Sequence, residues 1–482
     1  MTQTTGRDST TTDRRLDPEV LKVAAALIVG LIAVIFDTTI VAVALQTLSR
    51  ELHTTVDTIQ WVTTAYLLAL GASIPLVAWA QARLGGKRLW LIALTVFLAG
   101  SVLCTLAWDA SSLIGFRVVQ GVGGGLMTPL MQTLVMHAAG GKNLGRVMGI
   151  VMLPAVLGPI LGPVVGGLVL HWLDWRWLFL VNVPVCAIGF ALAVWLLPAD
   201  RPSGRARLDV TGLLLMCPAM VGLLLGLSDV SKPGGVERPD VWGPVLAGAV
   251  LLALFVRHAR RTGDRALVRV GLLKRRSVAA AAVLLFLSGA ALFGAMLLLP
   301  LYWQQVWGQD VLGAGLLLAP QGVGILVSRP LAGRLTDTVG PRRVALVGFV
   351  VVGVATAVYA VAGPQTPWWV LLTALVVRGA GFGALMVPIT TVAYIGLERD
   401  LVPHASILTR ICQQVGGSFG TAVLAVVLTA GTASAGHDRA RLAAGFDDAF
   451  WWAVAFTVLA TAVSFLIPGR PSPSRQNPSR QS

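Results

Sequence analysis

A few ionisable side chains lie well inside long apolar runs of this sequence, among them Asp37, Arg117, Arg378 and Arg410. At the centre of a membrane span a charged side chain costs about 2.5–3.5 kcal/mol on insertion scales unless it is paired or has a function. The acids nearest to other runs, among them Asp57 and Asp447, lie toward run ends. Asp37 is therefore the candidate for a buried group that binds and releases a proton.

Asp37 and Arg117 are predicted to reach similar depths from opposite sides of a membrane. At about 1.5 Å per helical residue, Asp37 lies roughly 22 Å from Lys22 at the inner end of the first run, and Arg117 lies roughly 9 Å from Ser111 at the outer end of the fourth. We expect Asp37 to hold a coupling proton and Arg117 to modulate it as two halves of the protein rock. The alternative is a fixed pair, or separate partners, that only orients the two helices.

The other two arginines have structural interpretations. Arg378 precedes a glycine-rich stretch, and we expect it to donate to backbone carbonyls across closely packed helices rather than to contact a substrate. Arg410 lies about one turn from the inner end of its run, so its side chain is expected to extend back to the membrane surface.

The elements that position these residues are apolar runs. The 482-residue chain is 56% hydrophobic and 12% charged, whereas soluble domains have roughly 25% charged residues. A membrane span needs about 20 apolar residues. About fourteen runs meet this requirement, and the eighth is short: 21–48, 58–80, 88–107, 111–137, 144–170, 176–197, 208–228, 241–256, 277–303, 311–333, 343–362, 367–395, 404–430 and 448–467.

The basic residues give the orientation of the runs. With fourteen spans and both termini in the cytoplasm, 28 of the 37 Lys and Arg residues fall on the inner side, as the positive-inside rule requires. A net charge of +15 divided into short clusters between spans argues against a nucleic-acid surface. Arginine far outnumbers lysine, which is typical of a GC-rich bacterial genome. We therefore predict a multi-pass protein of a bacterial cytoplasmic membrane.

The fifth run contains small residues at regular spacing. Gly158, Gly162 and Gly166 recur every four residues along one face, and Gly167 follows. Such a face allows a neighbouring helix to approach closely, and Pro159 and Pro163 remove backbone donors and bend the helix. The pattern predicts a kinked gate helix, and the alternative is a generic packing face.

The chain also contains an internal repeat. The loop after the second run and the loop after the tenth share a pattern of glycine and basic residues, which indicates two matching six-helix halves with a site between them. The predicted units are a tail (1–20), a first half (21–200), an extra helix pair (201–256), a basic linker (257–276), a second half (277–467) and a second tail (468–482). The loop residues are Arg83, Gly85, Lys87 and Arg88, and Gly333, Asp337, Gly340, Arg342 and Arg343.

Several of these segments resemble one known family. Residues 113–125 read LIGFRVVQGVGGG and residues 158–167 read GPILGPVVGG. Phe36–Ile40, Gln60 with Trp61, Trp175–Trp177 with Asn182, and Leu208 with Asp209 and Gly212 extend the match along nearly the whole chain. The sequence resembles the fourteen-helix drug:proton antiporters of the major facilitator superfamily.

The resemblance implies an all-α membrane fold with helices arranged 6+2+6 and a proton-coupled exporter of small hydrophobic or monocationic compounds. It implies Asp37 as the proton-coupling acid, residues 158–167 as the antiporter motif, no cofactor, energy from the proton gradient, and a monomer. One departure is Ala82, where the family carries an aspartate in a loop thought to latch one conformation. The first-half loop is therefore expected to serve mainly as a topology anchor.

The substrate is poorly specified by the sequence. A largely apolar cavity with a few polar groups suits hydrophobic substrates. An exporter of an endogenous metabolite is the alternative within transporters. A membrane enzyme is disfavoured because the six histidines form no catalytic or metal-binding cluster, and the four cysteines lie apart in apolar runs. The candidate cavity residues are Gln60, Tyr66, Gln132, Gln304, Gln321 and Gln414.

Overall fold

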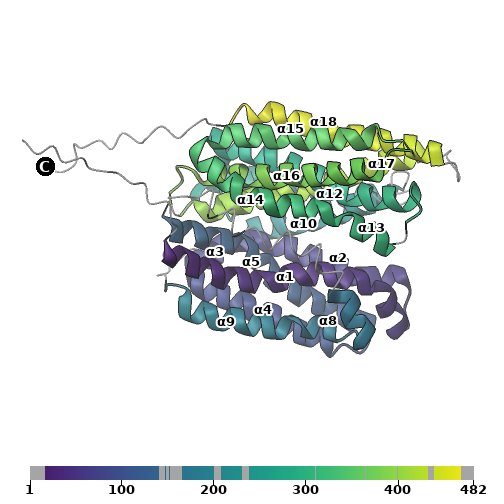
Figure 1. Ribbon diagram of the computed structural model, residues 1–482. Coiled ribbons are helices and arrows are strands. Elements are labelled where there is room, and N and C mark those ends of the chain that lie inside the picture. Colours follow the sequence, from purple (N-terminus) through teal and green to yellow (C-terminus); the bar gives the residue numbers. More distant parts are fainter. Residues whose placement is uncertain are drawn as a thin grey trace, which may run out of the picture.

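The structure is a computed structural model in which every regular element is helical among the residues described: 17–140, 147, 151, 165–199, 208–230, 238–309, 311–363, 365–398, 400–432 and 439–467. The long helices run side by side in a bundle, with the N-terminal helices in one group and the C-terminal helices in the other (Figure 1). Both predicted tails lie almost wholly outside the described residues.

The N-terminal group is arranged around α5. The helices α4 and α2 pack along α5, and α1 packs against α9. This arrangement places α1, α4, α5 and α9 around a common interior. The elements are α1 (Pro18–Glu51), α2 (Val56–Ser73), η1 (Ile74–Leu76), α3 (Val77–Leu84), α4 (Gly86–Thr105), α5 (Ala110–Ala139), α8 (Trp177–Leu180) and α9 (Asn182–Leu196).

The C-terminal group repeats this pattern of packing. The helix α12 packs along α17, and α16 packs between α14 and α15. The tenth predicted span is built from two helices, α13 and α14. The elements are α12 (Arg276–Gln305), α13 (Val311–Leu317), α14 (Ala319–Thr338), α15 (Pro341–Ala360), α16 (Trp368–Tyr394), α17 (Val402–Thr432) and α18 (Arg439–Ser464).

Between the two groups the chain forms the pair α10 (Val210–Val230) and α11 (Pro239–Thr262). The helix α10 packs against α2 of the first group and α17 of the second. The helix α11 is longer than the short eighth span that the sequence predicts. It takes in the first residues assigned to the linker, because Arg257 to Thr262 continue the helix. The rest of the linker forms two short 3-10 turns, η2 (Gly263–Arg265) and η3 (Val270–Lys274).

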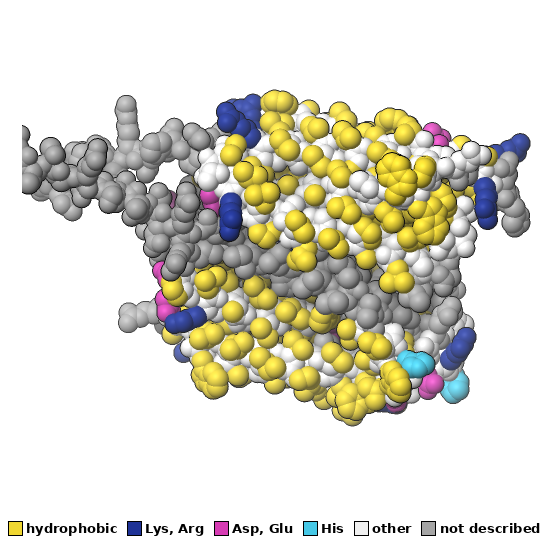
Figure 2. All heavy atoms as spheres, in the orientation of Figure 1, with side chains coloured by type: hydrophobic (Ala, Val, Ile, Leu, Met, Phe, Trp, Pro, Cys, Tyr) yellow, Lys and Arg dark blue, Asp and Glu magenta, His cyan; other side chains and the backbone are white. Residues whose placement is uncertain are grey.

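The outer surface of the bundle has the distribution of apolar and charged side chains expected of a membrane protein. Apolar side chains cover its side, and the basic side chains gather toward its two ends (Figure 2). Twelve helices among the described residues are long and apolar enough to span a membrane. The 30-residue α5, which carries Arg117, Gln120 and Gln132, is not among these twelve. The predicted fifth span lies mostly outside the described residues, so a total of fourteen stays a prediction.

Candidate functional site

The centre of the first half is a buried carboxylate with three donors. Arg117 Nη1 donates to Asp37 Oδ2 at 2.5 Å. Gln120 Nε2 and Asn182 Nδ2 both donate to Asp37 Oδ1, at 3.0 and 3.1 Å. The side chains of Asp37, Arg117, Gln120 and Asn182 are all buried. The structure therefore brings together the two residues that the sequence predicts at a common depth.

A serine on α4 completes this network. Ser101 Oγ accepts from Gln120 Nε2 at 2.7 Å and from Asn182 Nδ2 at 2.9 Å. The two amide groups thus lie between the carboxylate and the hydroxyl, and Gln120 Oε1 also accepts from Arg117 Nη1 at 2.7 Å. Side chains from α1, α4, α5 and α9 meet at one point. We call Asp37, Arg117, Gln120, Asn182 and Ser101 the carboxylate network.

Arg117 has three further contacts and one free donor. Its Nε donates to the backbone oxygen of Val62 at 3.1 Å, and its guanidinium lies 3.9 Å from the centre of the Tyr66 ring and 5.8 Å from that of Phe179. Among the described residues, neither Arg117 Nη2 nor the Tyr66 hydroxyl has a hydrogen-bond partner. The arginine is thus positioned by backbone and aromatic groups as well as by the carboxylate.

The network surrounds one buried carboxylate with donors. Arg117, Gln120 and Asn182 all donate to Asp37, and loss of Asp37 would leave the buried Arg117 without its counter-charge. Every member lies in the first half, so a rigid rocking of the two halves leaves the pair intact. Separation of Asp37 from its donors requires α1 to move against α5 and α9 within its own half.

The glycines of α5 explain how Arg117 reaches the interior. A Cβ at Gly121 would lie 2.5 Å from the backbone oxygen of Tyr66, and one at Gly123 would lie 2.5 Å from the backbone nitrogen of Phe97. The helix therefore packs against α2 and α4 at backbone contact distance. A capping box at the start of α5 fixes its entry, because Asp109 accepts from the Ser112 backbone N–H and Ser112 Oγ accepts from the Asp109 backbone N–H.

Arg378, like Arg329, is a buried arginine of the second half, and its three hydrogen-bond acceptors are neutral. Its Nε donates to Thr356 Oγ1, its Nη1 to Gln321 Oε1 and its Nη2 to the backbone oxygen of Ala291, at 3.1, 2.7 and 3.1 Å. The expectation that Arg378 donates to backbone carbonyls across closely packed helices is confirmed for Ala291 of α12, while its other two acceptors are side chains of α15 and α14. Among the described spans, a carboxylate buried against an arginine thus occurs in the first half alone.

Arg410 differs from its prediction. It lies eight residues into α17, and its Nη1 donates to Gln413 Oε1 at 3.1 Å, one turn further into the helix. A side chain that extended to the inner surface would point the other way, so that expectation is wrong. The reason is a neutral hydrogen-bond partner inside the bundle.

The six cavity candidates do not form one group. Tyr66 lies under Arg117, and Gln321 accepts from Arg378. Gln132 accepts from Tyr394 and Ser406 at 3.0 and 3.1 Å, which joins α5 to the second half. The other three are Gln60, which is exposed on α2, and Gln304 and Gln414, which are half-buried on α12 and α17.

The predicted gate helix is described only in part. Gly158, Pro159, Gly162 and Pro163 lie outside the described residues. Residues 165–172 are helical, with Gly167 exposed. A Cβ at Gly166 would lie 3.2 Å from the backbone oxygen of Ile40. Because Ile40 follows Asp37 by three residues, this helix contacts α1 within one turn of the carboxylate.

The two repeated loops have a common backbone shape. Gly85 joins α3 to α4 with a φ of 82°, and Gly340 precedes α15 with a φ of 101°, a region that favours glycine. Lys87 donates to the backbone oxygens of Val194 and Leu197, both at 2.7 Å, and so caps the C-terminal end of α9. Its role is therefore more than topology.

The remaining loop residues lie around these turns. Arg342 lies over the ring of Phe465 at 5.4 Å, and Gly333 is buried in α14. The exposed members are Arg83, Arg88, Asp337 and Arg343. Among the described residues no three His, Cys, Asp or Glu side chains gather as a metal site would require.

Comparison with known proteins identifies the family. The model of the Major Facilitator Superfamily matches residues 27–421. The chain belongs to the major facilitator superfamily. This protein is 37% identical over 417 residues to the multidrug resistance protein B homolog of Mycobacterium tuberculosis, a match that covers 86% of the chain and 77% of the relative. It is 27% identical over 410 residues to the lincomycin resistance protein LmrB of Bacillus subtilis, covering 84% of each.

Solved structures support the same fold. The human organic anion transporter MFSD10 superposes with a TM-score of 0.65 at 15% identity, covering 93% of this chain and 100% of that one. The proton:xylose symporter XylE superposes with a TM-score of 0.64 at 14% identity, covering 94% and 97%. This protein is therefore a multi-pass membrane transporter of the superfamily and not an enzyme.

Proposed function

We propose that this transporter is a fourteen-helix, proton-coupled antiporter that exports small hydrophobic or monocationic compounds across a bacterial cytoplasmic membrane, as a monomer with both termini in the cytoplasm. Relatives named for multidrug and lincomycin resistance support the class of substrate. The pair α10 and α11, inserted between two six-helix halves, supports the fourteen-helix branch.

The observation that carries the proposal is the ion pair of Asp37 and Arg117 inside the carboxylate network. Burying a carboxylate and a guanidinium inside a membrane protein costs free energy, so such a pair indicates that the charges have a function. In the proposed cycle the network holds Asp37 ionised, and a shift of α1 separates Asp37 from Arg117 so that the carboxylate takes up a proton. The return of α1 releases the proton.

The contact of Gly166 with Ile40 gives this movement a source. In the proposal, the predicted span of residues 144–170 pushes or releases α1 one turn from Asp37 as the two halves rock. Rocking of the two halves would in this way move α1 relative to the other helices of the carboxylate network. The glycine and proline series of residues 158–167 acts as the gate in this scheme.

Transport in proteoliposomes tests the proposal. An imposed proton gradient should drive uptake of ethidium, a hydrophobic monocation, into vesicles that contain the wild-type protein, and a protonophore should abolish it. Asp37→Asn should lose gradient-driven uptake but keep ethidium counterflow without a gradient. Asp448→Asn, which changes an exposed acid on α18, is the matched control. Gradient-driven uptake by a well-folded Asp37→Asn variant would refute the proposal.

A further inference from the structure

Arg410 is a half-buried cation whose hydrogen-bonding capacity is only partly used. Its Nη1 donates to the neutral Gln413, and its Nε is buried without a partner among the described residues. Arg378 provides the contrast, because its Nε and both Nη atoms have acceptors. A guanidinium with an unused donor and no counter-charge is costly in a membrane interior, so it indicates a ligand.

The side chain of Arg410 points into the protein. Phe419, which is exposed at the side of α17, follows nine residues later, and nine residues at 3.6 per turn place it about 180° around the helix. Arg410 is half-buried, and Gln414, four residues on, shares its face. This face of α17 therefore presents a cation and an amide away from the exposed side.

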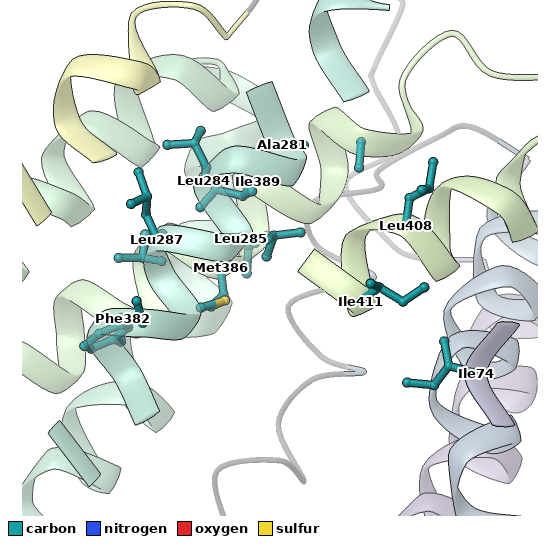
Figure 3. Packing of buried hydrophobic residues seen from close by; sticks show 14 of the residues in the cluster. Ile74, Ala281, Leu284, Leu285, Leu287, Phe382, Met386, Ile389, Leu408 and Ile411 are labelled. Atoms are coloured by element: carbon teal, nitrogen blue, oxygen red, sulfur yellow. The ribbon is translucent and has the colours of Figure 1, made fainter. Parts of the chain in front are cut away.

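The surroundings combine apolar and polar groups. Gln413 donates to Met386 Sδ at 3.8 Å, a weak acceptor. Figure 3 shows the buried side chains of Met386 from α16 and Leu285 from α12 near each other, with Ile411 from α17 between them and Ile74 of the first half. An apolar wall with a few convergent donors is the usual composition of a small-molecule site.

The charges around Arg410 indicate whether its ligand is anionic or cationic. Asp37 is the one acid that the sequence places in the middle of a predicted span, and Arg117 already neutralises it. The sequence of residues 141–170, most of which lie outside the described residues, contains no Asp or Glu. A cationic ligand near Arg410 would meet a like charge, whereas an anionic ligand would complete its hydrogen bonds.

We propose that Arg410, together with Gln413 and Gln414, forms a substrate subsite for the carboxylate, or a comparable anionic group, of an amphiphilic molecule. The inference rests on the proposed export function for its purpose, and it adds amphiphilic anions to the hydrophobic and monocationic compounds proposed above. The guanidinium binds the anionic group, and the side chains of Met386, Leu285 and Ile411 contact the apolar part.

Equilibrium binding to the purified protein in nanodiscs tests this subsite without any proton gradient. The probes are 1-pyrenebutyrate, its methyl ester and a pyrenylalkyl trimethylammonium ion, and pyrene fluorescence anisotropy reports binding. We expect the wild-type protein to bind the acid at least about tenfold more tightly than the ester, since hydrogen bonds to charged groups are worth that factor or more. The cation should bind more weakly than the acid.

Arg410→Gln should remove the preference for the acid while leaving the affinity for the ester unchanged. Arg260→Gln, which changes an exposed arginine on α11, should retain the preference. Equal or tighter wild-type binding of the ester or the cation would overturn the proposal, even if Arg410→Gln fails to fold. A folded Arg410→Gln protein that still binds the acid more tightly than the ester, by the wild-type factor, would also overturn it. Loss of gradient-driven transport alone would count against the antiport cycle and not against this subsite.

Discussion

Removal of the Asn182 side chain should destabilise the protein. Asn182 Nδ2 donates to Asp37 Oδ1 at 3.1 Å and to Ser101 Oγ at 2.9 Å. A hydrogen bond to a charged group contributes about 1.5–3 kcal/mol. Asn182→Ala removes one of the three donors to the buried carboxylate, so the free energy of unfolding should fall by about 1.5–3 kcal/mol.

The assay is thermal unfolding of the purified protein in detergent micelles at pH 7. Gln305→Ala, which removes an exposed amide at the end of α12, is the matched control and should keep the wild-type unfolding midpoint. Circular dichroism and size-exclusion chromatography establish that both variants fold. An unchanged midpoint in a folded Asn182→Ala protein would refute the assignment of Asn182 as a positioning residue for Asp37.

Three further predictions concern residues that stabilise the helical bundle. Gly121→Val should destabilise the protein by at least about 1–3 kcal/mol, because its Cβ would lie 2.5 Å from the Tyr66 backbone oxygen, whereas Gly115→Val, with nothing within 4 Å, should be near neutral in thermal unfolding. Lys87→Met should destabilise it by about 1–2 kcal/mol by uncapping α9, and an equal loss in the exposed control Arg88→Met would contradict this reason. Asp209 is held by His258 and by the backbone N–H groups of Gly212 and Leu267; burial raises its pKa, but these hydrogen bonds lower it overall. The ionised Asp209 therefore stabilises the folded protein above its unfolded-state pKa of about 3.9, and this stabilisation is lost as the pH falls through the lower pKa of the folded state. In thermal unfolding, Asp209→Asn should unfold at a lower temperature than wild type at pH 7, and the difference in unfolding temperature should narrow below pH 4.

Helical geometry explains why the ion pair could be predicted from the sequence. A fixed rise per residue converts the positions of Asp37 and Arg117 into depths, and the basic loops give the direction of each helix. Charges inside apolar runs are few, so a pair at one depth has few alternatives. The likeness of the two loops could also be predicted, since both contain a glycine that adopts a positive φ, Gly85 and Gly340.

The rest of the carboxylate network was not predictable in this way. Ser101, Gln120 and Asn182 are neutral, and such side chains serve equally well as contacts between helices anywhere in a bundle. Their convergence depends on helix rotation and on the backbone approach that Gly121 and Gly123 allow. Gln120 and Asn182 did lie in the segments that carry the family resemblance, which was the one available signal.

The same limit applies to the polar residues assigned to a cavity. The depth of a residue along its helix does not determine which residue of a neighbouring helix its side chain contacts. Gln321 satisfies Arg378 and Gln132 joins two halves, although both look like cavity residues by position. Arg410 shows the opposite error, because its distance from the helix end suggested a surface contact while its head group turns toward Gln413.

The most direct test of the central claim is substrate-induced proton release from the purified transporter. The protein is held in weakly buffered detergent solution with a pH-indicating dye, at a pH where the wild-type protein binds its proton, and a saturating amount of a transported compound is added. If Asp37 exchanges the coupling proton, the wild-type protein releases a proton on binding, and Asp37→Asn binds the compound without any release. Equal proton release by the two proteins would contradict the account.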